Sequence, residues 1–228
     1  MTLENDIRME RLDKTKEAAA QTNEELDWPN LKRFQKENEE VMKSDNDKIV
    51  FMGDSITEGW AVSNPAFFKK NNFINRGIGG QTTPQMLIRF KQDAIHLNPK
   101  MVIINGGTND IAENNGPATP EMIIDNITSM AEICSKNKIT VALSTITPVY
   151  SYSWNKEVID VPGKISQVNS SLKKYSNQNN IPFIDYYSAM VDGQKGLLSA
   201  YGSDGVHPTK EGYKVMVDVL KNTIPGIE

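Results

Sequence analysis

The 228-residue sequence predicts an α/β fold, in which helices cover both faces of a parallel sheet. Short apolar segments alternate along the chain with longer segments of helical periodicity, which is the order of elements in such folds. The central apolar segment shows no polar alternation, as expected for a strand that is covered on both faces. Five strands are predicted, at 48–52, 73–75, 101–104, 139–146 and 181–184.

A polar N-terminal arm is predicted for residues 1–29, followed by a single domain over 30–228. Residues 1–26 are rich in charged and amide side chains, and they fit either a partner-binding arm or a frayed terminus. The dipeptide Trp28-Pro29 marks the boundary. Four apolar residues then fall on one helical stripe and predict a helix over 30–43: Leu31, Phe34, Val41 and Met42.

The remaining helices are predicted from buried stripes and from residues that favour helix starts. Phe67 and Phe68 indicate a short buried helix after the first strand. Thr83 is predicted to cap the next helix, with Pro84 at its first position, and Thr209 to cap the last one. The long stripes are Leu87, Phe90, Ala94 and Leu97; Ile123, Ile127, Met130 and Cys134; Ile165, Val168, Leu172 and Tyr175; and Tyr213, Met216, Val217 and Leu220.

The composition disfavours several functional classes. The formal net charge is −4 and no block of basic residues is interleaved with aromatic ones, so nucleic-acid binding is not expected. No run approaches the ~18 apolar residues of a membrane span. Cys134 is the only cysteine, and its place on the apolar face of a predicted helix indicates an inert core thiol rather than a nucleophile.

The sequence as written lacks the apolar core of a secretory signal, so a cytoplasmic location is expected. The alternative, an exported protein whose leader has been removed, stays open. The absence of an intrachain disulfide fits a reducing compartment but agrees with both alternatives.

The first strand runs into Gly53-Asp54-Ser55, where a helix is predicted to begin. Gly53 is expected to permit a sharp turn that a residue with a Cβ would resist. Ser55 then lies at the carboxyl end of a strand, beside the free N–H groups of the next helix. Taken alone, the tripeptide fits an ordinary turn and N-cap equally well.

Residues that follow the other strands converge on the same place. Gly79-Gly80 follows the second strand and Asn109 follows the third. Because the loops at the carboxyl ends of parallel strands lie along one edge of a sheet, we expect these residues to lie near Ser55. Asp204 and His207, which follow the fifth strand, can reach that edge too.

These residue types match the needs of nucleophilic catalysis. A serine hydroxyl is a poor nucleophile until a base that titrates near neutrality accepts its proton, which points to histidine. Of the two histidines, His96 ends a predicted helix and is interpreted as a structural or surface residue, whereas His207 follows Asp204 by three residues. That spacing can hold the carboxylate against one ring nitrogen and leave the other for Ser55.

An oxyanion site is predicted from the same loops. Backbone N–H groups of Ser55 and a loop glycine could converge there with the side-chain amide of Asn109. The alternative interpretations are an Asx-turn residue for Asn109 and plain turn residues for Gly79 and Gly80.

Four short blocks together resemble the SGNH (GDSL) hydrolases, with a match from about residue 48 to 222. The blocks are Gly53-Asp54-Ser55, Asn75-x-x-x-x-Gly80, Gly107-x-Asn109-Asp110 and Asp204-x-x-His207-Pro208. The resemblance implies a three-layer α/β/α sandwich of flavodoxin-like type that acts on esters without a metal or organic cofactor. It also implies Ser55 as nucleophile, His207 as base with Asp204 as its partner, and Ser55, Gly80 and Asn109 as oxyanion donors. Gly80 is preferred to Gly77 and Gly79 by counting from Asn75.

The expected substrate is a small-molecule or carbohydrate ester with a short, acetyl-like acyl group. Four aromatic residues near the predicted site fit either stacking on a sugar or aryl group or ordinary packing: Trp60, Tyr150, Tyr152 and Trp154. Thioesterase or lysophospholipase activity on the same residues is the alternative within the class. A non-catalytic small-molecule-binding module, or a flavin-binding one, is the alternative outside it, and the scarcity of His and Cys disfavours a metal site.

Overall fold

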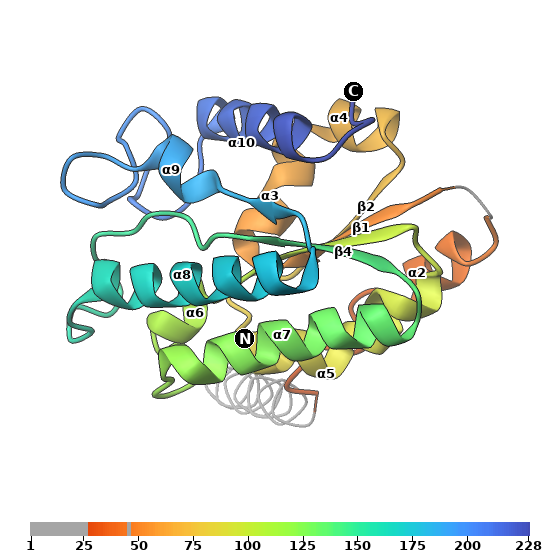
Figure 1. Ribbon diagram of the computed structural model, residues 1–228, viewed down its shortest axis with the longest axis horizontal. Coiled ribbons are helices and arrows are strands. Elements are labelled where there is room, and N and C mark those ends of the chain that lie inside the picture. Colours follow the sequence, from red (N-terminus) through yellow and green to blue (C-terminus); the bar gives the residue numbers. More distant parts are fainter. Residues whose placement is uncertain (1–26, 45–46) are drawn as a thin grey trace, which may run out of the picture.

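The computed structural model describes residues 27–44 and 47–228, and its centre is a five-stranded sheet (Figure 1). The strands are β1 (Ile49–Gly53), β2 (Phe73–Gly77), β3 (Met101–Asn105), β4 (Thr140–Ser144) and β5 (Phe183–Ile184). All neighbouring strands pair in parallel, in the order β2-β1-β3-β4-β5. This is the strand order of flavodoxin-like sheets, and it confirms the predicted fold class.

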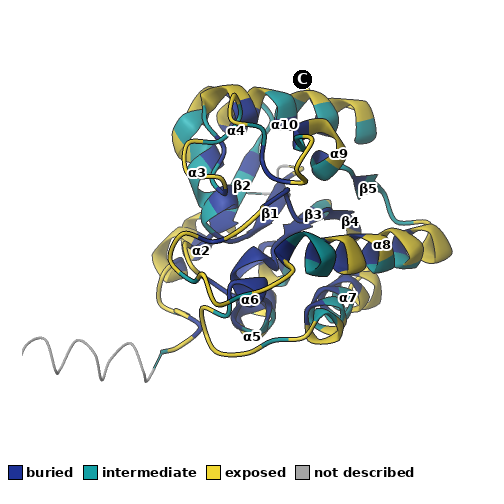
Figure 2. Ribbon diagram, turned by 90° about the vertical axis from the view of Figure 1, so that its left-hand side faces the viewer, coloured by how far each residue is buried: buried dark blue, intermediate teal, exposed yellow. Residues whose placement is uncertain are grey.

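Helices form a layer on each face of the sheet (Figures 1 and 2). One layer contains α3 (Ser55–Ser63), α4 (Pro65–Lys70), α9 (Tyr186–Met190) and α10 (Lys210–Thr223). The other contains α5 (Thr83–Asp93), α6 (Thr108–Ile111), α7 (Pro120–Lys136) and α8 (Val161–Asn179), with a 3-10 turn at Ile95–Leu97. The short helix α2 (Gln35–Val41) lies against α5.

Two hydrophobic cores separate the sheet from its two helix layers. Successive strand residues point to opposite faces, so Val50 and Met52 enter the core under α5, α7 and α8, while Ile49 and Phe51 enter the other. Trp60 belongs to the second core. Its side chain is 2% exposed and its ring lies 5.9 Å from that of Tyr213, so this tryptophan is packing rather than pocket lining.

The helix predicted over 30–43 is shorter than expected. Turns occupy most of the segment 27–34, and α2 begins only at Gln35. Asn30 has a left-handed backbone with φ of 57°, which interrupts helical geometry, and the Asp27 carboxylate accepts the N–H of Leu31 at 2.8 Å. Phe34 is buried beneath the Arg76 guanidinium at 4.6 Å, whereas Met42, predicted on the same stripe, is 48% exposed.

The start of α5 also differs from the prediction by one residue. Thr82 is the N-cap, and Gln85 Oε1 accepts its backbone N–H at 2.9 Å. Thr83 therefore takes the first helical position, because its own side chain and N–H bond Asp110 instead. A capping box, rather than a proline at the first position, defines this helix start.

Residues 1–26, and with them most of the predicted arm, lie outside the described residues. The segment 28–31 is attached to α5 by glutamine side chains. Gln85 Nε2 donates to the Trp28 carbonyl at 2.7 Å and Gln81 Nε2 to the Pro29 carbonyl at 2.8 Å. Gln92 Nε2 donates in the same way to the carbonyl of Leu31. These bonds fix the segment beside the loop that leads into α5.

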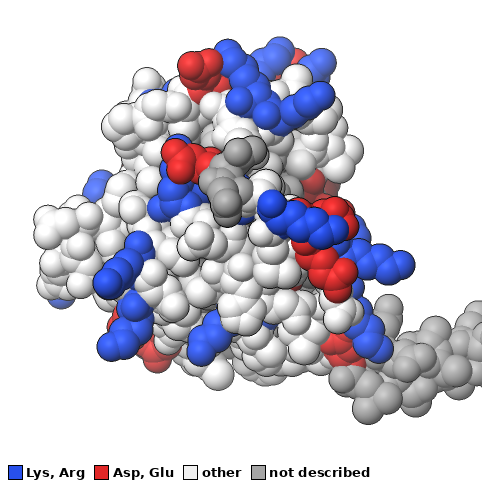
Figure 3. Space-filling view, turned by 90° about the vertical axis from the view of Figure 1, so that its right-hand side faces the viewer, with Lys and Arg blue, Asp and Glu red and all other residues white. Residues whose placement is uncertain are grey.

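The C-terminus lies at the amino ends of the strands, which is the edge of the sheet opposite to segment 28–31. The Glu228 N–H donates to Asn71 Oδ1 at 2.8 Å, just before β2 begins. Figure 3 shows the face at the amino ends of the strands, where Lys and Arg side chains are mixed with Asp and Glu. Within 27–44 and 47–228, every helix is too short or too polar to cross a bilayer.

Candidate active site

The candidate site lies at the carboxyl ends of β1, β2 and β3, the edge of the sheet that faces the viewer in Figure 2. The strand order reverses between β1 and β3, and open α/β sheets bind ligands in the crevice at such a point. Ser55 begins α3 directly after β1, and Asn109 lies in α6 directly after β3. Gly79 and Gly80 occupy the loop after β2.

The structure brings Ser55, His207 and Asp204 into one hydrogen-bonded row. Ser55 Oγ lies 2.9 Å from His207 Nε2, and His207 Nδ1 lies 2.7 Å from Asp204 Oδ2. A carboxylate only accepts hydrogen bonds, so the neutral ring carries its proton on Nδ1. Nε2 then has a lone pair directed at the serine hydroxyl, which is the arrangement that a general base needs.

The loop of Asp204 and His207 is held by its own residues. Asp204 Oδ1 accepts the N–H groups of Val206 at 2.9 Å and His207 at 2.7 Å, and Gly205 between them has φ of +82°. Partial burial raises the pKa of Asp204, but these bonds and the His207 ring outweigh it and hold the pKa below its usual value. The carboxylate is therefore ionised at neutral pH and available to an imidazolium.

Gly53 is required by close packing at the end of β1. A Cβ there would lie 2.0 Å from Thr57 Oγ1 and 2.6 Å from the Asn105 carbonyl oxygen. Its backbone lies outside the left-handed region, so the expected turn does not depend on unusual dihedral angles. The close approach brings the start of α3, and with it Ser55, against the end of β3.

Asp54 is fully buried beneath the serine. Its Oδ1 accepts the N–H of Ile56 at 2.9 Å and caps α3, while its Oδ2 meets no donor within the described part of the chain. Burial raises the pKa of this carboxyl to about 7, although the Ile56 bond and the His207 charge act in the other direction. Its sequence neighbour Ser55 is partly exposed, so the turn separates a buried acid from an accessible alcohol.

The two predicted oxyanion residues lie on adjacent loops. Gly80 is exposed with φ of +74°, and a Cβ there would meet open space. Asn109 is 4% exposed, and its Nδ2 donates one hydrogen to the Gln81 carbonyl at 2.9 Å. An amide carries two N–H bonds, so a second one remains for a ligand.

A chain of hydrogen bonds orients the Asn109 amide. Asn114 Nδ2 donates to Asn109 Oδ1 at 2.8 Å, and Trp154 Nε1 donates to Asn114 Oδ1 at 2.9 Å. Indole nitrogen can only donate, so Asn114 must present its oxygen to Trp154 and its NH₂ to Asn109. Asn109 in turn must present its NH₂ to the side where Gln81 lies.

Two buried charged residues for which the sequence predicted no role support these loops. Asp110 accepts the Thr83 N–H at 2.9 Å and the Thr83 hydroxyl at 2.6 Å, which ties α6 to the start of α5. Arg89 is 0% exposed and donates to Gln81 Oε1 at 2.6 Å and to the Gly53 carbonyl at 3.0 Å. A usable signal was present, since Arg89 lies one residue before Phe90 on the buried stripe of its helix.

The remaining residues considered in the sequence lie either at the surface or in the core. Tyr150 and Trp154 are 61% and 48% exposed, whereas Tyr152 is buried with its hydroxyl 2.9 Å from Thr108 Oγ1. His96 is exposed, and burial raises the pKa of the Cys134 thiol to about 12, which makes it unreactive at neutral pH. Across the described ranges, we find no group of three His, Cys, Asp or Glu side chains placed to hold a metal ion.

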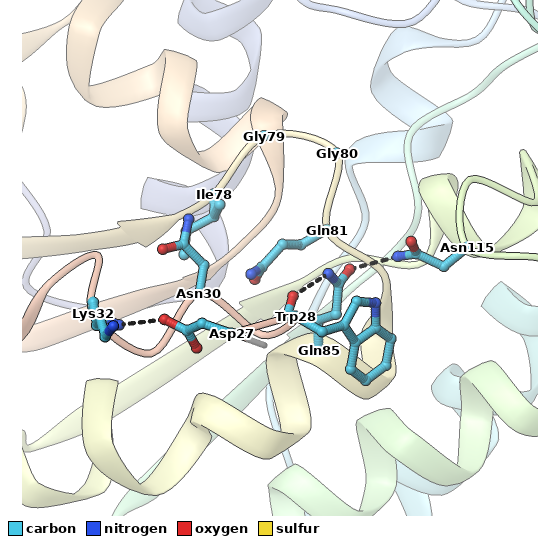
Figure 4. Close-up of a pocket in the computed structure, with 10 residues that line it drawn as sticks. All are labelled: Asp27, Trp28, Asn30, Lys32, Ile78, Gly79, Gly80, Gln81, Gln85 and Asn115. Atoms are coloured by element: carbon cyan, nitrogen blue, oxygen red, sulfur yellow. Dashed lines mark hydrogen bonds between the residues drawn. The ribbon is translucent and has the colours of Figure 1, made fainter. Parts of the chain in front are cut away.

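Two depressions flank the row of Ser55, His207 and Asp204. One of about 680 Å³ adjoins Gly79 and Gly80 (Figure 4). The other, of about 530 Å³, adjoins Asp204 and Gly205 and is lined by the loop that follows β4.

Comparison with known proteins gives one family and several close structures. The profile described as "GDSL-like Lipase/Acylhydrolase family" matches residues 51–215. A Bacteroides fragilis protein proposed to be an acylhydrolase is 48% identical, with a TM-score of 0.83, over 86% of this chain and 95% of its own. A GDSL-like lipase from Bacteroides thetaiotaomicron is 44% identical, with a TM-score of 0.82, over 85% and 96%.

More distant matches include an esterase. The acetylxylan esterase of Xylanibacter ruminicola is 24% identical over 218 residues, which are 80% of this chain but only 44% of that protein. The chain thus spans less than half of this relative's length. A structure of the acetylxylan esterase Axe2 from Geobacillus stearothermophilus matches with a TM-score of 0.65 at 19% identity, over 80% of this chain and 95% of its own, which shows the same fold.

Proposed function

The chain belongs to the GDSL-like lipase/acylhydrolase family, and from this membership we propose that it is a serine esterase that removes short acyl groups, chiefly acetyl, from small-molecule or carbohydrate esters. The family and the relatives support a hydrolase. The ester substrate and the roles of single residues are the proposal.

The row of hydrogen bonds from Ser55 through His207 to Asp204 carries the proposal. Its two distances, 2.9 and 2.7 Å, lie within the range for general-base activation of a serine. A turn and N-cap, the alternative explanation of Gly53-Asp54-Ser55, would give Ser55 no histidine partner. A flavin-binding site would leave Asp204 and His207 without a role.

Acyl transfer to water follows from this geometry. Ser55 Oγ attacks the ester carbonyl carbon while His207 Nε2 accepts the hydroxyl proton, and Asp204 stabilises the resulting imidazolium. The imidazolium then protonates the alcohol oxygen as the carbon–oxygen bond breaks. Water attacks the acyl-serine with its proton passing to Nε2, and the carboxylic acid and the Ser55 hydroxyl are released.

The oxyanion that forms in both steps needs donors on the opposite side of Ser55 from the base. We assign this role to the N–H groups of Ser55 and Gly80 and to the second N–H of Asn109 Nδ2. In other serine hydrolases, the loss of one such donor lowers kcat about 10²–10³-fold.

Acetyl esters of carbohydrates are favoured by the relatives, two of which are acetylxylan esterases. Thioesterase or lysophospholipase chemistry would use the same residues with a long acyl chain. A profile of p-nitrophenyl esters from acetate to decanoate separates these alternatives, since activity that rises steadily with chain length contradicts the acetyl assignment.

The deciding experiment compares wild type with Ser55→Ala and with Ser63→Ala, a serine at the other end of the same helix. Wild type and Ser63→Ala should hydrolyse p-nitrophenyl acetate and react with a fluorophosphonate probe, and Ser55→Ala should do neither. Equal turnover by Ser55→Ala excludes the mechanism. Failure of the wild type to bind the probe would favour a non-catalytic binding module.

A further inference from the structure

The depression of about 680 Å³ next to the loop 78–81 has one wall that comes from far away in the sequence (Figure 4). The residues that line it are Asp27, Trp28, Asn30, Lys32, Ile78, Gly79, Gly80, Gln81, Gln85 and Asn115. Segment 27–32 thus faces the loop that contains the proposed oxyanion donor Gly80. The volume lies within the range of ~300–1,000 Å³ that is usual for small-molecule sites.

The backbone from which the Trp28 side chain projects is fixed in position. Gln85 Nε2 holds the Trp28 carbonyl at 2.7 Å, and Gln85 Oε1 accepts Asn115 Nδ2 at 2.7 Å from the other side. Figure 4 shows these two bonds as a row from Trp28 through Gln85 to Asn115. Gln81 binds the next carbonyl, that of Pro29, and is itself held by the buried Arg89. A ligand would therefore meet a preformed surface.

The depression and the reaction centre meet at the loop of Gly79 and Gly80. Gly79 and Gly80 are both exposed, and a Cβ placed on Gly79 would lie 3.8 Å from the Ser55 Cβ. A molecule bound to Ser55 can therefore extend over this two-glycine step into the depression, where side chains on the loop would obstruct it.

The lining suits a hydroxylated ring better than an alkyl chain. Among the described residues that line it, Ile78 is the only aliphatic one and is 7% exposed, whereas amide groups, one acid and one amine make up most of the remainder. Trp28 offers an aromatic surface and is 40% exposed. An indole presents a broad apolar face for the C–H bonds of a sugar, and amides match its hydroxyl groups.

The charged side chains of the lining argue against a phospholipid headgroup as the ligand. Asp27 and Lys32 bring opposite charges to the same wall, and Asp27 also accepts the Leu31 N–H at 2.8 Å. A balanced pair gives no net attraction for the phosphate of a lipid headgroup. A neutral polyol has no such requirement.

We propose that this depression is a subsite for a sugar unit of an acetylated oligosaccharide, adjacent to the unit that carries the scissile ester, with Trp28 as its stacking platform. The inference rests on the proposed esterase function and adds the substrate class. Acetyl has two carbon atoms and cannot fill the depression, and the leaving oxygen must approach His207 on the other side of Ser55. The occupant is therefore a part of the substrate remote from the scissile bond.

Steady-state kinetics on two substrates test the subsite: p-nitrophenyl acetate, which cannot reach it, and acetylated xylo-oligosaccharides, which can. Trp28→Ala should raise KM for the oligosaccharide about tenfold while kcat and the kinetics on p-nitrophenyl acetate stay unchanged. Trp28→Phe, which keeps a smaller ring, should lose about threefold. Ile88→Ala, an exposed apolar truncation on the helix that carries Gln85, is the control and should match wild type.

Three outcomes overturn the subsite. They are unchanged KM for the oligosaccharide, an equal loss on both substrates, and a loss confined to long-chain p-nitrophenyl esters, which would assign the depression to an acyl chain. Calorimetric binding of the oligosaccharide to Ser55→Ala, with and without Trp28→Ala, separates this inference from the proposed function. Weaker binding by the double variant supports the subsite whatever the turnover, and equal binding contradicts it.

Discussion

The two sides of Ser55 are built differently. On one side, Asp204 and His207 lie three residues apart in an exposed loop, with 44% and 39% of their side chains accessible. On the other side, Asn109 is 4% exposed, and the groups that orient it come from three places in the chain: Gln81, Asn114 and, through Asn114, Trp154. The base is therefore positioned by local contacts and the oxyanion site by long-range ones.

The carboxyl groups of the two sides differ accordingly. Hydrogen bonds from neighbouring N–H groups and the His207 ring outweigh partial burial and lower the pKa of Asp204. On the other side of Ser55, burial raises the pKa of Asp54 to about 7 and also raises that of Asp110, against the bonds from Thr83. The carboxylate in the exposed loop is therefore ionised and available for catalysis. The buried carboxyl groups instead cap a helix and join secondary-structure elements.

The largest expected effect is a loss of kcat from a substitution on the exposed side of Ser55. Asp204→Asn should lower kcat about 10⁴-fold, because the amide no longer fixes the imidazole tautomer that accepts the serine proton. The melting temperature should change by only a degree or two, since the side chain is exposed. Kinetics on p-nitrophenyl acetate and a thermal melt measure both quantities. A large loss of stability would mean that this loop is not the independent unit described above.

On the buried side we expect stability to change first. Arg89→Met should lower the free energy of unfolding by about 3–5 kcal/mol, because it leaves Asp93, 3.2 Å away and fully buried, without its ion pair. Arg33→Met is the matched control, since Arg33 pairs with Glu58 at 3.5 Å on the surface and should change stability by less than about 1 kcal/mol. Urea unfolding measures both, and equal effects would remove the distinction between the two regions.

The raised pKa of Asp54 predicts a pH dependence of stability. Asp54 titrates near 3.8 in the unfolded chain and near 7 in the folded one, so between these values the folded state binds a proton that the unfolded state has lost. Stability should therefore fall as pH rises from 4 to 7 and then level off, by on the order of 2–4 kcal/mol. Asp54→Asn, which keeps the cap acceptor, should lack this slope. Parallel slopes in urea titrations of the two proteins would contradict the assignment.

The smallest expected effect is on kcat, and it tests the hydrogen bonds from Trp154 through Asn114 that orient Asn109. Asn114→Asp replaces the NH₂ that faces Asn109 Oδ1 with an oxygen, and it should lower kcat about tenfold with KM unchanged. This is less than the ~10²–10³ expected for Asn109→Ala, which removes the donor itself. Asn137→Asp, at an exposed amide after α7 that lies outside both the site and the depression, is the control. Equal kcat for wild type and Asn114→Asp would show that Asn109 keeps its orientation without help.

The difference between local and long-range contacts also explains how much could be predicted from the sequence. Strand positions and the pairing of Asp204 with His207 depend on residues close together in the chain, and the structure has them as expected. The helix over 30–43 was predicted too long because Asn30 takes a left-handed backbone in a turn set by Asp27. Periodicity alone does not register such a break.

Contacts between distant segments escaped prediction. The pattern predicts Thr83 as a helix cap, since it cannot show that Asp110, after another strand, binds this residue. Trp28 was assigned to a boundary, and nothing in its neighbours indicates that Gln85 holds its carbonyl beside the loop 78–81. Arg89 is absent from the predicted site, although it joins β1 to that loop.

The location of the C-terminus at the amino edge of the sheet has a practical consequence. A tag or linker added after Glu228 extends from the edge of the sheet opposite to Ser55, where the Glu228 N–H bonds Asn71. Protein immobilised on a bead through that end would present its catalytic rim to the solution, accessible even to an insoluble polymer.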